Sequence, residues 1–252
     1  MSSSDDIERA RDLIAGAHRI TVLTGAGVST DSGIPDFRGP QGVWTKNPAA
    51  ELIWNFDNYR ADPEVRRAAW QDRVEHPMFT ARPGRAHEAL AALERSGKLV
   101  ALLTQNIDEL HQAAGSSADS VVELHGTNHH TVCLTCGAVA PMADALERVR
   151  AGDDDPECER CGGVLKATTI MFGEMLDMDV LSRARDAALG CDLFLAVGTS
   201  LGVHPAAGLV DLASAAGADV VIVNAEPTPY DRLAAVVLRD GISEVLPAIV
   251  PG

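Results

Sequence analysis

Residues 19–27 read RITVLTGAG, an apolar run that passes directly into a glycine-rich turn. Continuous apolar residues bounded by such a turn are typical of a strand that is buried on both faces. A strand followed by Gly-Ala-Gly is also how a phosphate-binding loop begins, because glycines let backbone N–H groups approach a pyrophosphate at a helix N-terminus. The dehydrogenase fingerprint GxGxxG, however, requires glycine at position 30, where this chain has Thr30. The stretch therefore favours a nucleotide-binding sheet and argues against a hydride-transferring dehydrogenase.

The alternation of apolar strands and helical patterns continues along the chain. Further strand patterns are LVALLT (99–104), VVEL (121–124), DLFLAV (192–197), DVVIVN (219–224) and AAVVLR (234–239). Helical periodicity is found at 6–17, 84–96, 108–114, 179–190 and 205–216. Continuous apolar strands separated by helices indicate a parallel sheet that is covered on both faces. We therefore predict an α/β fold with a doubly wound parallel sheet.

Two segments interrupt this alternation. Residues 39–82 contain aromatic residues and helical patterning without a strand, and residues 126–168 contain two cysteine pairs and a run of three aspartates. We interpret both segments as inserts that form a smaller second domain beside the sheet. The predicted boundaries are 1–38, 83–125 and 169–252 for the sheet domain, 39–82 for a helical module, and 126–168 for the cysteine-containing insert.

Composition and charge exclude several classes of protein. The chain has 252 residues, of which 46% are hydrophobic and 23% charged, and 36 acidic against 21 basic residues give a net charge of −15. A strongly acidic protein is not expected to bind nucleic acid or an anionic membrane through its overall charge. The N-terminal residues MSSSDDIERARDLI have no signal-peptide pattern, and no apolar run is long enough to span a bilayer. We expect a cytoplasmic protein with reduced cysteines.

Four of the five cysteines form two pairs with metal-ligand spacing. Cys133-x2-Cys136 and Cys158-x2-Cys161 are each followed by glycine, which permits the tight turn behind a metal knuckle. Four thiolates predict a closed, tetrahedral and structural zinc site. His129 and His130 lie close enough in sequence to be rival ligands. Residues 133–166 hold four basic and seven acidic side chains, so this zinc ribbon is not expected to bind nucleic acid.

Polar residues follow four of the predicted strands. These strand ends are Thr104-Gln105-Asn106-Ile107-Asp108, Glu123-Leu124-His125-Gly126, Gly198-Thr199-Ser200 and Asn224-Ala225-Glu226. Ligands of parallel sheets bind beyond the carboxyl ends of the strands, so we expect a binding crevice there. The ordinary pKa of a histidine suits general-base work near neutral pH, so His125 is a candidate base. Taken singly, Asp108 could equally cap the following helix and His125 could be a half-buried structural histidine.

Taken together, these motifs resemble those of the sirtuins, the NAD-dependent protein-lysine deacylases. The resemblance covers residues 20–245 in order and rests on the following segments: GAGVSTDSGIPDFR (25–38), TQNID (104–108), HG (125–126), the cysteine pairs, MFGE (171–174), GTSLGVHPAA (198–207) and NAEPTP (224–229). It implies a Rossmann-like large domain and a small domain made of a helical module and a four-cysteine zinc ribbon. It also implies transfer of an acyl group from lysine to ADP-ribose with release of nicotinamide.

The resemblance assigns expected roles to individual residues. His125 would be the catalytic base, assisted by Asn106, and an acyl-lysine peptide would pair with the segment Met171, Phe172, Gly173 and Glu174. NAD, as a consumed cosubstrate, would be bound by Gly25, Ala26, Gly27, Asp36, Phe37, Arg38, Trp44, Gln105, Asn106, Ile107, Asp108, Gly198, Thr199, Ser200, Asn224, Ala225, Glu226 and Ile242. The zinc ligands would be Cys133, Cys136, Cys158 and Cys161. The implied partners are acyl-lysine proteins or peptides.

Some alternatives stay open at this level. Desuccinylating sirtuins pair a Tyr with an Arg three residues later, and the nearest candidates here are Trp70 and Arg73. We interpret Trp70 as core of the helical module and Arg73 as a solvated side chain, with plain deacetylation as the default. Mono-ADP-ribosyl transfer from the same NAD site is an alternative activity, and a zinc-ribbon binding module that only senses NAD is an alternative of another class. Cys191 is expected to be a buried small hydrophobe.

Overall fold

The computed structural model describes residues 2–36, 39, 42 and 53–250 and contains two sheets. The larger sheet has six parallel strands in the order β3-β2-β1-β7-β8-β9. Their bounds are β1 Ile20–Thr24, β2 Leu99–Thr104, β3 Val121–Glu123, β7 Leu193–Val197, β8 Asp219–Val223 and β9 Val236–Leu238. All six coincide with predicted strands, and the strand order is that of a Rossmann-like, doubly wound sheet. The predicted fold class is confirmed.

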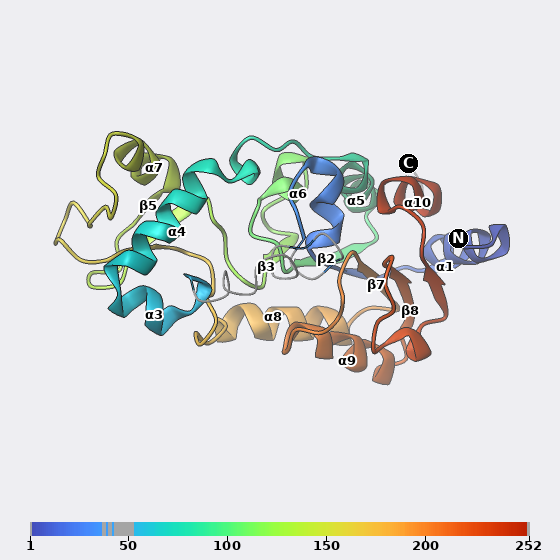
Figure 1. Cartoon of the computed structure of the whole chain (residues 1–252). Coiled ribbons are helices and arrows are strands. Elements are labelled where there is room, and N and C mark those ends of the chain that lie inside the picture. Colours follow the sequence, from blue (N-terminus) through green and yellow to red (C-terminus); the bar gives the residue numbers. More distant parts are fainter. Residues whose placement is uncertain (1, 37–38, 40–41, 43–52, 251–252) are drawn as a thin grey trace.

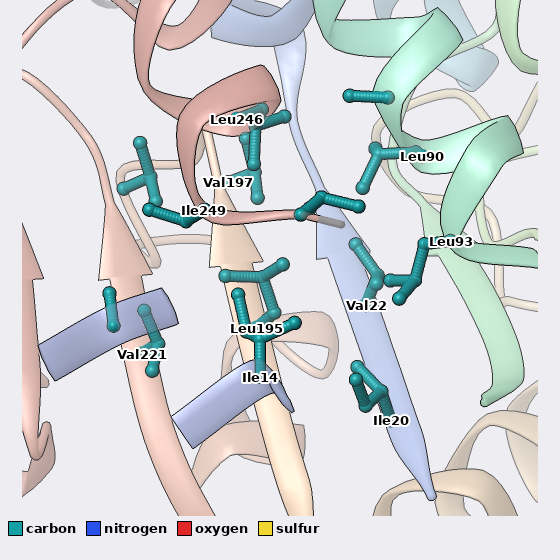
Figure 2. Packing of buried hydrophobic residues seen from close by; sticks show 14 of the residues in the cluster. Ile14, Ile20, Val22, Leu90, Leu93, Leu195, Val197, Val221, Leu246 and Ile249 are labelled. Carbon is teal, nitrogen blue, oxygen red and sulfur yellow. The ribbon is translucent and has the colours of Figure 1, made fainter. Parts of the chain in front are cut away.

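Helices cover both faces of this sheet, because its strands are apolar on both sides. One face packs against α1 (Ser4–Gly16), α5 (Arg85–Arg95) and α10 (Ile242–Ile249). The opposite face packs against α8 (Met178–Leu189) and α9 (Leu209–Ala215) (Figure 1). Within β7, Leu195 and Phe194 therefore enter different clusters. Figure 2 shows the first cluster, in which Leu90 and Leu93 of α5 lie over Val22 of β1.

The strand order reverses direction between β1 and β7, and two glycine-rich loops meet there. The backbone N–H of Gly25 donates to the carbonyl oxygen of Val197 at 3.0 Å, and that of Gly27 donates to Gly198 at 2.9 Å. A Cβ atom on either Gly25 or Gly27 would lie 2.8 Å from the 198–199 loop. The glycines therefore have a packing role that the sequence interpretation did not foresee. They let the loop after β1 lie directly against the loop after β7.

Gly198 is the most constrained position of this contact. Its φ is +61°, and an added Cβ would lie 2.5 Å from the backbone nitrogen of Val28. We expect Gly198→Ala to lower the free energy of unfolding by about 1–2 kcal/mol through backbone strain and by about 1–3 kcal/mol more through overpacking. Gly217→Ala is the matched control, because Gly217 has φ +95° and open space around its Cα. Equal destabilisation of the two variants in urea titrations would show that the loop contact is not tight.

The second sheet belongs to a smaller unit beside the first. It is antiparallel in the order β5-β4-β6, with β4 His130–Cys133, β5 Val139–Pro141 and β6 Leu165–Ala167. Around it lie α7 (Met142–Arg150), α3 (Phe56–Ala61) and α4 (Pro63–Glu75) (Figure 1). Trp70 of α4 shares one hydrophobic cluster with Met142 and Leu146 of α7 and with Cys133. The helical module and the ribbon therefore share a core, while the exact domain boundaries stay a prediction.

Local structure differs from the sequence prediction in two places. The helix predicted at 108–114 is the short α6 (Leu110–Ala113), because the Asp108 carboxylate accepts the Leu110 N–H at 3.0 Å and begins the helix later. The segment after β1 is a 3-10 helix, η1 (Ala26–Ser32). Among the described residues, no helix is long and apolar enough to cross a membrane.

Candidate functional site

Sheets of this order bind their ligands in a crevice beyond the carboxyl ends of the strands, at the point where the strand order reverses. Here the ends of β1, β2 and β7 meet at that point. Gln105 follows β2, and its backbone N–H donates to the carbonyl oxygen of Thr24 at the end of β1 at 3.0 Å. Its side-chain amide donates to Thr199 Oγ1, beyond β7, at 2.9 Å. Three strand ends that are distant in sequence are thus joined at one edge of the sheet. The predicted site residues Gly25, Gly198 and Thr199 come together here.

A buried network of polar side chains lies beneath η1. Ser29 Oγ donates to Asp108 Oδ2 at 2.7 Å and accepts from Asn106 Nδ2 at 3.1 Å. His87 Nε2 lies 3.3 Å from Ser29 Oγ, and His87 Nδ1 accepts the Gly84 N–H at 3.2 Å. Since Nδ1 is an acceptor, Nε2 carries the proton and donates to Ser29. The network therefore directs the Ser29 proton to Asp108 and turns the amide NH₂ of Asn106 toward Ser29.

A second buried histidine, His111, packs against His87 of this network. The His111 ring lies 5.0 Å from the His87 ring, centroid to centroid, and its Nε2 contacts Thr24 Oγ1 at 2.9 Å. Burial lowers the pKa of His111 to about 3, and His87 adds to this effect. Burial also lowers the pKa of His87. Both imidazoles are therefore neutral at physiological pH, which keeps the buried region free of positive charge.

His125 follows β3 and is held in one orientation. Its Nδ1 lies 3.1 Å from the carbonyl oxygen of Gln105, and a carbonyl can only accept, so Nδ1 carries the proton. The Nε2 atom is therefore the unprotonated, basic nitrogen. Burial lowers the pKa of His125, and the hydrogen bond to Gln105 opposes that shift. A neutral imidazole with a free lone pair is what a general base needs near pH 7.

The direction of this shift predicts how activity depends on pH. Because the pKa of His125 lies below its ordinary 6.5, the base form persists on mild acidification. The acid limb of kcat/KM is expected to have its midpoint below pH 6.5. Burial raises the pKa of Glu123, two residues earlier, to about 7, so the profile is measured in both wild type and Glu123→Gln. A midpoint above 6.5 in the Glu123→Gln variant would contradict the assignment of His125.

The other half of the crevice follows β8. Asn224 is half-buried there, and Ala225 and Glu226 are exposed. The guanidinium of Arg239 donates to the carbonyl oxygens of Asn224 at 2.8 Å and Glu226 at 2.7 Å, so it holds this loop. Two further predicted residues, Ser200 beyond β7 and Ile242 at the start of α10, are exposed and half-buried respectively.

The segment 171–174 lies between the ribbon and the helical module. Phe172 forms a parallel bridge with Asn55, in which the Phe172 N–H donates to Trp54 and the Phe56 N–H donates to Phe172, both at 2.9 Å. The Met171 side chain is buried with Tyr59, whereas Phe172 and Gly173 are exposed. One edge of this short strand is therefore occupied by the protein itself. The Met171 backbone is engaged as well, since its N–H donates to Glu174 Oε2 at 2.8 Å and its carbonyl oxygen accepts the Glu174 N–H at 3.0 Å.

The four paired cysteines lie together and fit a zinc ion. Their Sγ atoms are all within 4.8 Å of one another, with Cys133–Cys161 at 3.5 Å and Cys136–Cys158 at 3.7 Å. A tetrahedral Zn–S₄ centre with bonds of about 2.3 Å has S–S edges of about 3.8 Å. His129 is no ligand, since its Nε2 contacts the Asp108 carbonyl oxygen at 3.2 Å. Among the described residues, the metal-binding group contains cysteines alone.

Comparisons with known proteins agree with this geometry. A family model described as the Sir2 family matches residues 25–205. The chain belongs to the Sir2 family. It is 54% identical over 239 residues to "NAD-dependent protein deacetylase 2" of Streptomyces coelicolor, an alignment that covers 95% of this chain and 99% of that protein.

Solved structures of Sir2 proteins resemble the chain closely. One, described as "Structural Basis for the Mechanism and Regulation of Sir2 Enzymes", has a TM-score of 0.90 and 40% identity and covers 98% of this chain and 97% of that one. Another contains a deacetylated p53 peptide and 3′-O-acetyl ADP ribose, with a TM-score of 0.89 and 34% identity, and covers 96% of both chains. The Rossmann-like sheet and the small unit are thus shared with Sir2 enzymes.

Not every predicted site residue of this Sir2 chain can be placed. Phe37, Arg38 and Trp44 lie outside the described residues. Asp36 is half-buried, and its carboxylate accepts the Gly39 N–H at 3.0 Å. Ile107 packs against the cluster formed by Ile34, Met78 and Leu110. Ala26 is half-buried at the start of η1.

Arg73 is a correction to the sequence interpretation. It is 1% exposed instead of solvated, and its guanidinium lies 5.4 Å from the Trp70 ring centroid and 5.5 Å from that of Trp54. It donates to the Ala69 carbonyl oxygen at 3.1 Å, and its Nε lies 3.4 Å from Asn128 Oδ1. Trp70 is fully buried in the core, as predicted. Cation–π contacts with tryptophan rings explain how a guanidinium can be buried here.

Two residues of the polar network were missed by sequence reasoning. Ser29 lies inside the glycine-rich loop motif, and His87 lies among alanines and leucines on α5. A histidine on an apolar helical face is more often a satisfied core residue than a functional one, so His87 carried little signal. The contact between the two spans 58 positions of sequence, and no local pattern encodes it.

Proposed function

We propose that this Sir2-family protein is an NAD-dependent protein-lysine deacetylase, which transfers the acyl group of the lysine to ADP-ribose and releases nicotinamide. The observation that carries the proposal is His125. Its Nδ1 proton is tied to Gln105, and its basic Nε2 belongs to the crevice where β1, β2 and β7 end. The names of the relatives support the same activity, since the Streptomyces protein is called an NAD-dependent protein deacetylase.

The crevice offers groups that suit NAD. Sheets of this order bind dinucleotides where the strand order reverses, and the glycine loop and Thr199 lie at that point. Asn106 is fixed by Ser29, so its remaining amide oxygen is held ready for the nicotinamide and its ribose. The Asp108 carboxylate beside it is held in place by Ser29 and by the Leu110 N–H. The loop held by Arg239 would contact the adenosine half. When bound, NAD supplies a ribose carbon that becomes electrophilic as nicotinamide leaves.

His125 moves the proton in the reaction. Its Nε2 would accept a proton from a ribose hydroxyl, whose oxygen would then bond to the acyl carbon. The bond from that carbon to the lysine nitrogen would break as water enters, which releases the free lysine amine. The resulting imidazolium is stabilised by the hydrogen bond from Nδ1 to the Gln105 carbonyl. General-base catalysis of this kind contributes about 10²–10⁴-fold. The four-cysteine zinc site would be closed, so it would stabilise the small unit and take no part in these steps.

The substrate would bind as an extended peptide beside residues 171–174. Phe172 uses one edge of its strand to pair with Trp54 and Phe56, and the Met171 backbone is bonded to Glu174. An added strand would therefore use the opposite edge at Gly173. Backbone pairing of this kind demands little of the peptide sequence. Acyl-lysine in many extended segments is therefore the expected substrate class. The protein itself is proposed to be cytoplasmic.

Product analysis tests the proposal. The protein is incubated with NAD and matched acetyl-lysine and succinyl-lysine peptides, and the products are separated by mass spectrometry. We expect NAD-dependent loss of acetyl, faster than loss of succinyl. Faster removal of succinyl would contradict the preference for acetyl, and a protein that becomes ADP-ribosylated without any deacylation would contradict the proposal. Binding of NAD without turnover of any peptide would favour a sensing module.

A further inference from the structure

Lys166 of β6 is a buried lysine with an unusual set of partners. It is 3% exposed, and its ammonium donates to the carbonyl oxygens of Ala167 at 2.9 Å and Thr169 at 2.7 Å. Its third contact is an ion pair with Glu174 Oε2 at 3.1 Å. Removing an ammonium from water is costly unless its three donors are satisfied. Here all three N–H groups have an acceptor.

The carboxylate of Glu174 links this ammonium to the segment 171–174. Glu174 Oε2 also accepts the backbone N–H of Met171 at 2.8 Å, and the Glu174 N–H donates to the Met171 carbonyl oxygen at 3.0 Å. Gly173 has φ +93° within this turn. The two contacts close the turn from Met171 to Glu174. Its shape therefore depends on a carboxylate that Lys166 holds from inside the small unit.

The segment from Lys166 to Glu174 is also hydrogen-bonded to the catalytic base. The Ile170 N–H donates to the carbonyl oxygen of His125 at 2.8 Å. Lys166 lies four residues before Ile170 in the sequence, and Glu174 lies four residues after it. The ion pair thus closes a loop of chain whose midpoint is bonded to His125. The geometry of the Lys166–Glu174 ion pair therefore fixes the position of the Met171–Glu174 turn relative to His125.

The surroundings of Lys166 disfavour its charged form, and Glu174 opposes that effect. Burial lowers the pKa of Lys166, the neighbouring Arg73 lowers it further, and Glu174 opposes both effects. The Glu174 carboxylate thus stabilises the charge of Lys166, whereas the carboxylate that acts on Arg73 is that of Asp72. Among the described residues, Glu174 is the carboxylate that pairs with Lys166.

We propose that Lys166 is a positioning residue for the acyl-lysine peptide, which acts by holding the Met171–Glu174 turn through Glu174. The inference rests on the proposed function, because it assigns to this turn the edge that receives the substrate backbone. Neither side chain touches the reacting atoms. Loss of the pair should loosen the turn and weaken peptide binding, while the NAD crevice at the ends of β1, β2 and β7 keeps its contacts.

Steady-state kinetics of Lys166→Met test the inference. We expect the KM for an acetyl-lysine peptide to rise about 10-fold, the equivalent of about 1.4 kcal/mol. The kcat and the KM for NAD should change by less than about 3-fold, and the zinc content should stay at wild-type level. Lys166→Arg keeps the charge and should restore most of the peptide KM. Arg148→Met is the matched control, since Arg148 pairs with Asp153 on the exposed side of the same ribbon.

A second variant keeps the test decisive. Glu174→Gln removes the charge with little change of shape and should raise the peptide KM in the same way, even where Lys166→Met does not fold. An unchanged peptide KM in Glu174→Gln, or loss of kcat and zinc together in both variants, would overturn the positioning role. Absence of peptide turnover by the wild type would overturn the proposed function and the inference with it. An active wild type with unaffected variants would overturn the inference alone.

Discussion

His125→Ala is expected to lower kcat for an acetyl-lysine peptide by about 10²–10⁴-fold, the usual contribution of a general base. The variant removes the one imidazole whose Nδ1 is tied to the Gln105 carbonyl and whose Nε2 is left basic. His125 is half-buried, so its removal should not prevent folding. The rate is measured by release of nicotinamide and by mass analysis of the peptide.

His130→Ala is the matched control for this prediction. His130 begins β4 of the small unit and is exposed, so its loss removes an imidazole without touching the crevice. Its kcat should stay within about 2-fold of wild type, as expected for an exposed position. NAD affinity and zinc content should be unchanged in both variants. A His125→Ala protein that keeps more than a tenth of the wild-type kcat would assign the base to another group.

Cys136→Ser is expected to release the zinc ion and to unfold the ribbon. Cys136 is exposed, so the substitution removes a thiolate ligand without opening a cavity in the core. Zinc binding contributes directly to the folding free energy of a small unit that lacks a large core. The ribbon shares its cluster with Trp70 of α4, so the helical module should loosen as well. The six-stranded sheet, with separate clusters on its two faces, should stay folded.

Elemental analysis and hydrogen exchange check this prediction together. Wild type should hold one zinc ion per chain and Cys136→Ser close to none. Amide protection should fall in β4, β6 and α7 and persist in β1, β7 and β8. Cys191→Ser is the control, because this buried thiol donates to the Ala188 carbonyl oxygen at 3.2 Å and lies outside the cysteine cluster. A Cys136→Ser protein with full zinc content and normal protection in β4 would contradict the assignment.

The large sheet could be predicted from the sequence because each strand is a continuous apolar run. Strands covered on both faces carry no polar alternation, so stretches such as 99–104 and 193–197 stand out against the helical segments between them. The cysteine spacing was equally informative, since two residues between ligands is a geometric requirement of the metal knuckle. These features are local, and local patterns are what a single sequence shows.

The parts of the site that sequence reasoning missed are held together by distant contacts. Ser29 meets Asp108 across 79 positions of sequence, and no periodicity marks either residue for the other. Arg73 was expected in solvent because isolated arginines seldom lie in a core. The structure buries it between two tryptophan rings, one of which precedes it by 19 residues. The ring contacts that stabilise the buried guanidinium depend on tertiary packing, which no local sequence pattern shows.

Deacylation by this protein is proposed to consume NAD at the crevice that His125 lines. It is tested most directly by the stoichiometry of one reaction, in which free nicotinamide, deacetylated peptide and acetyl-ADP-ribose are quantified together over time. We expect the three products to form in equal amounts and none to form without NAD. Deacetylated peptide that appears with free acetate while NAD stays intact would contradict it.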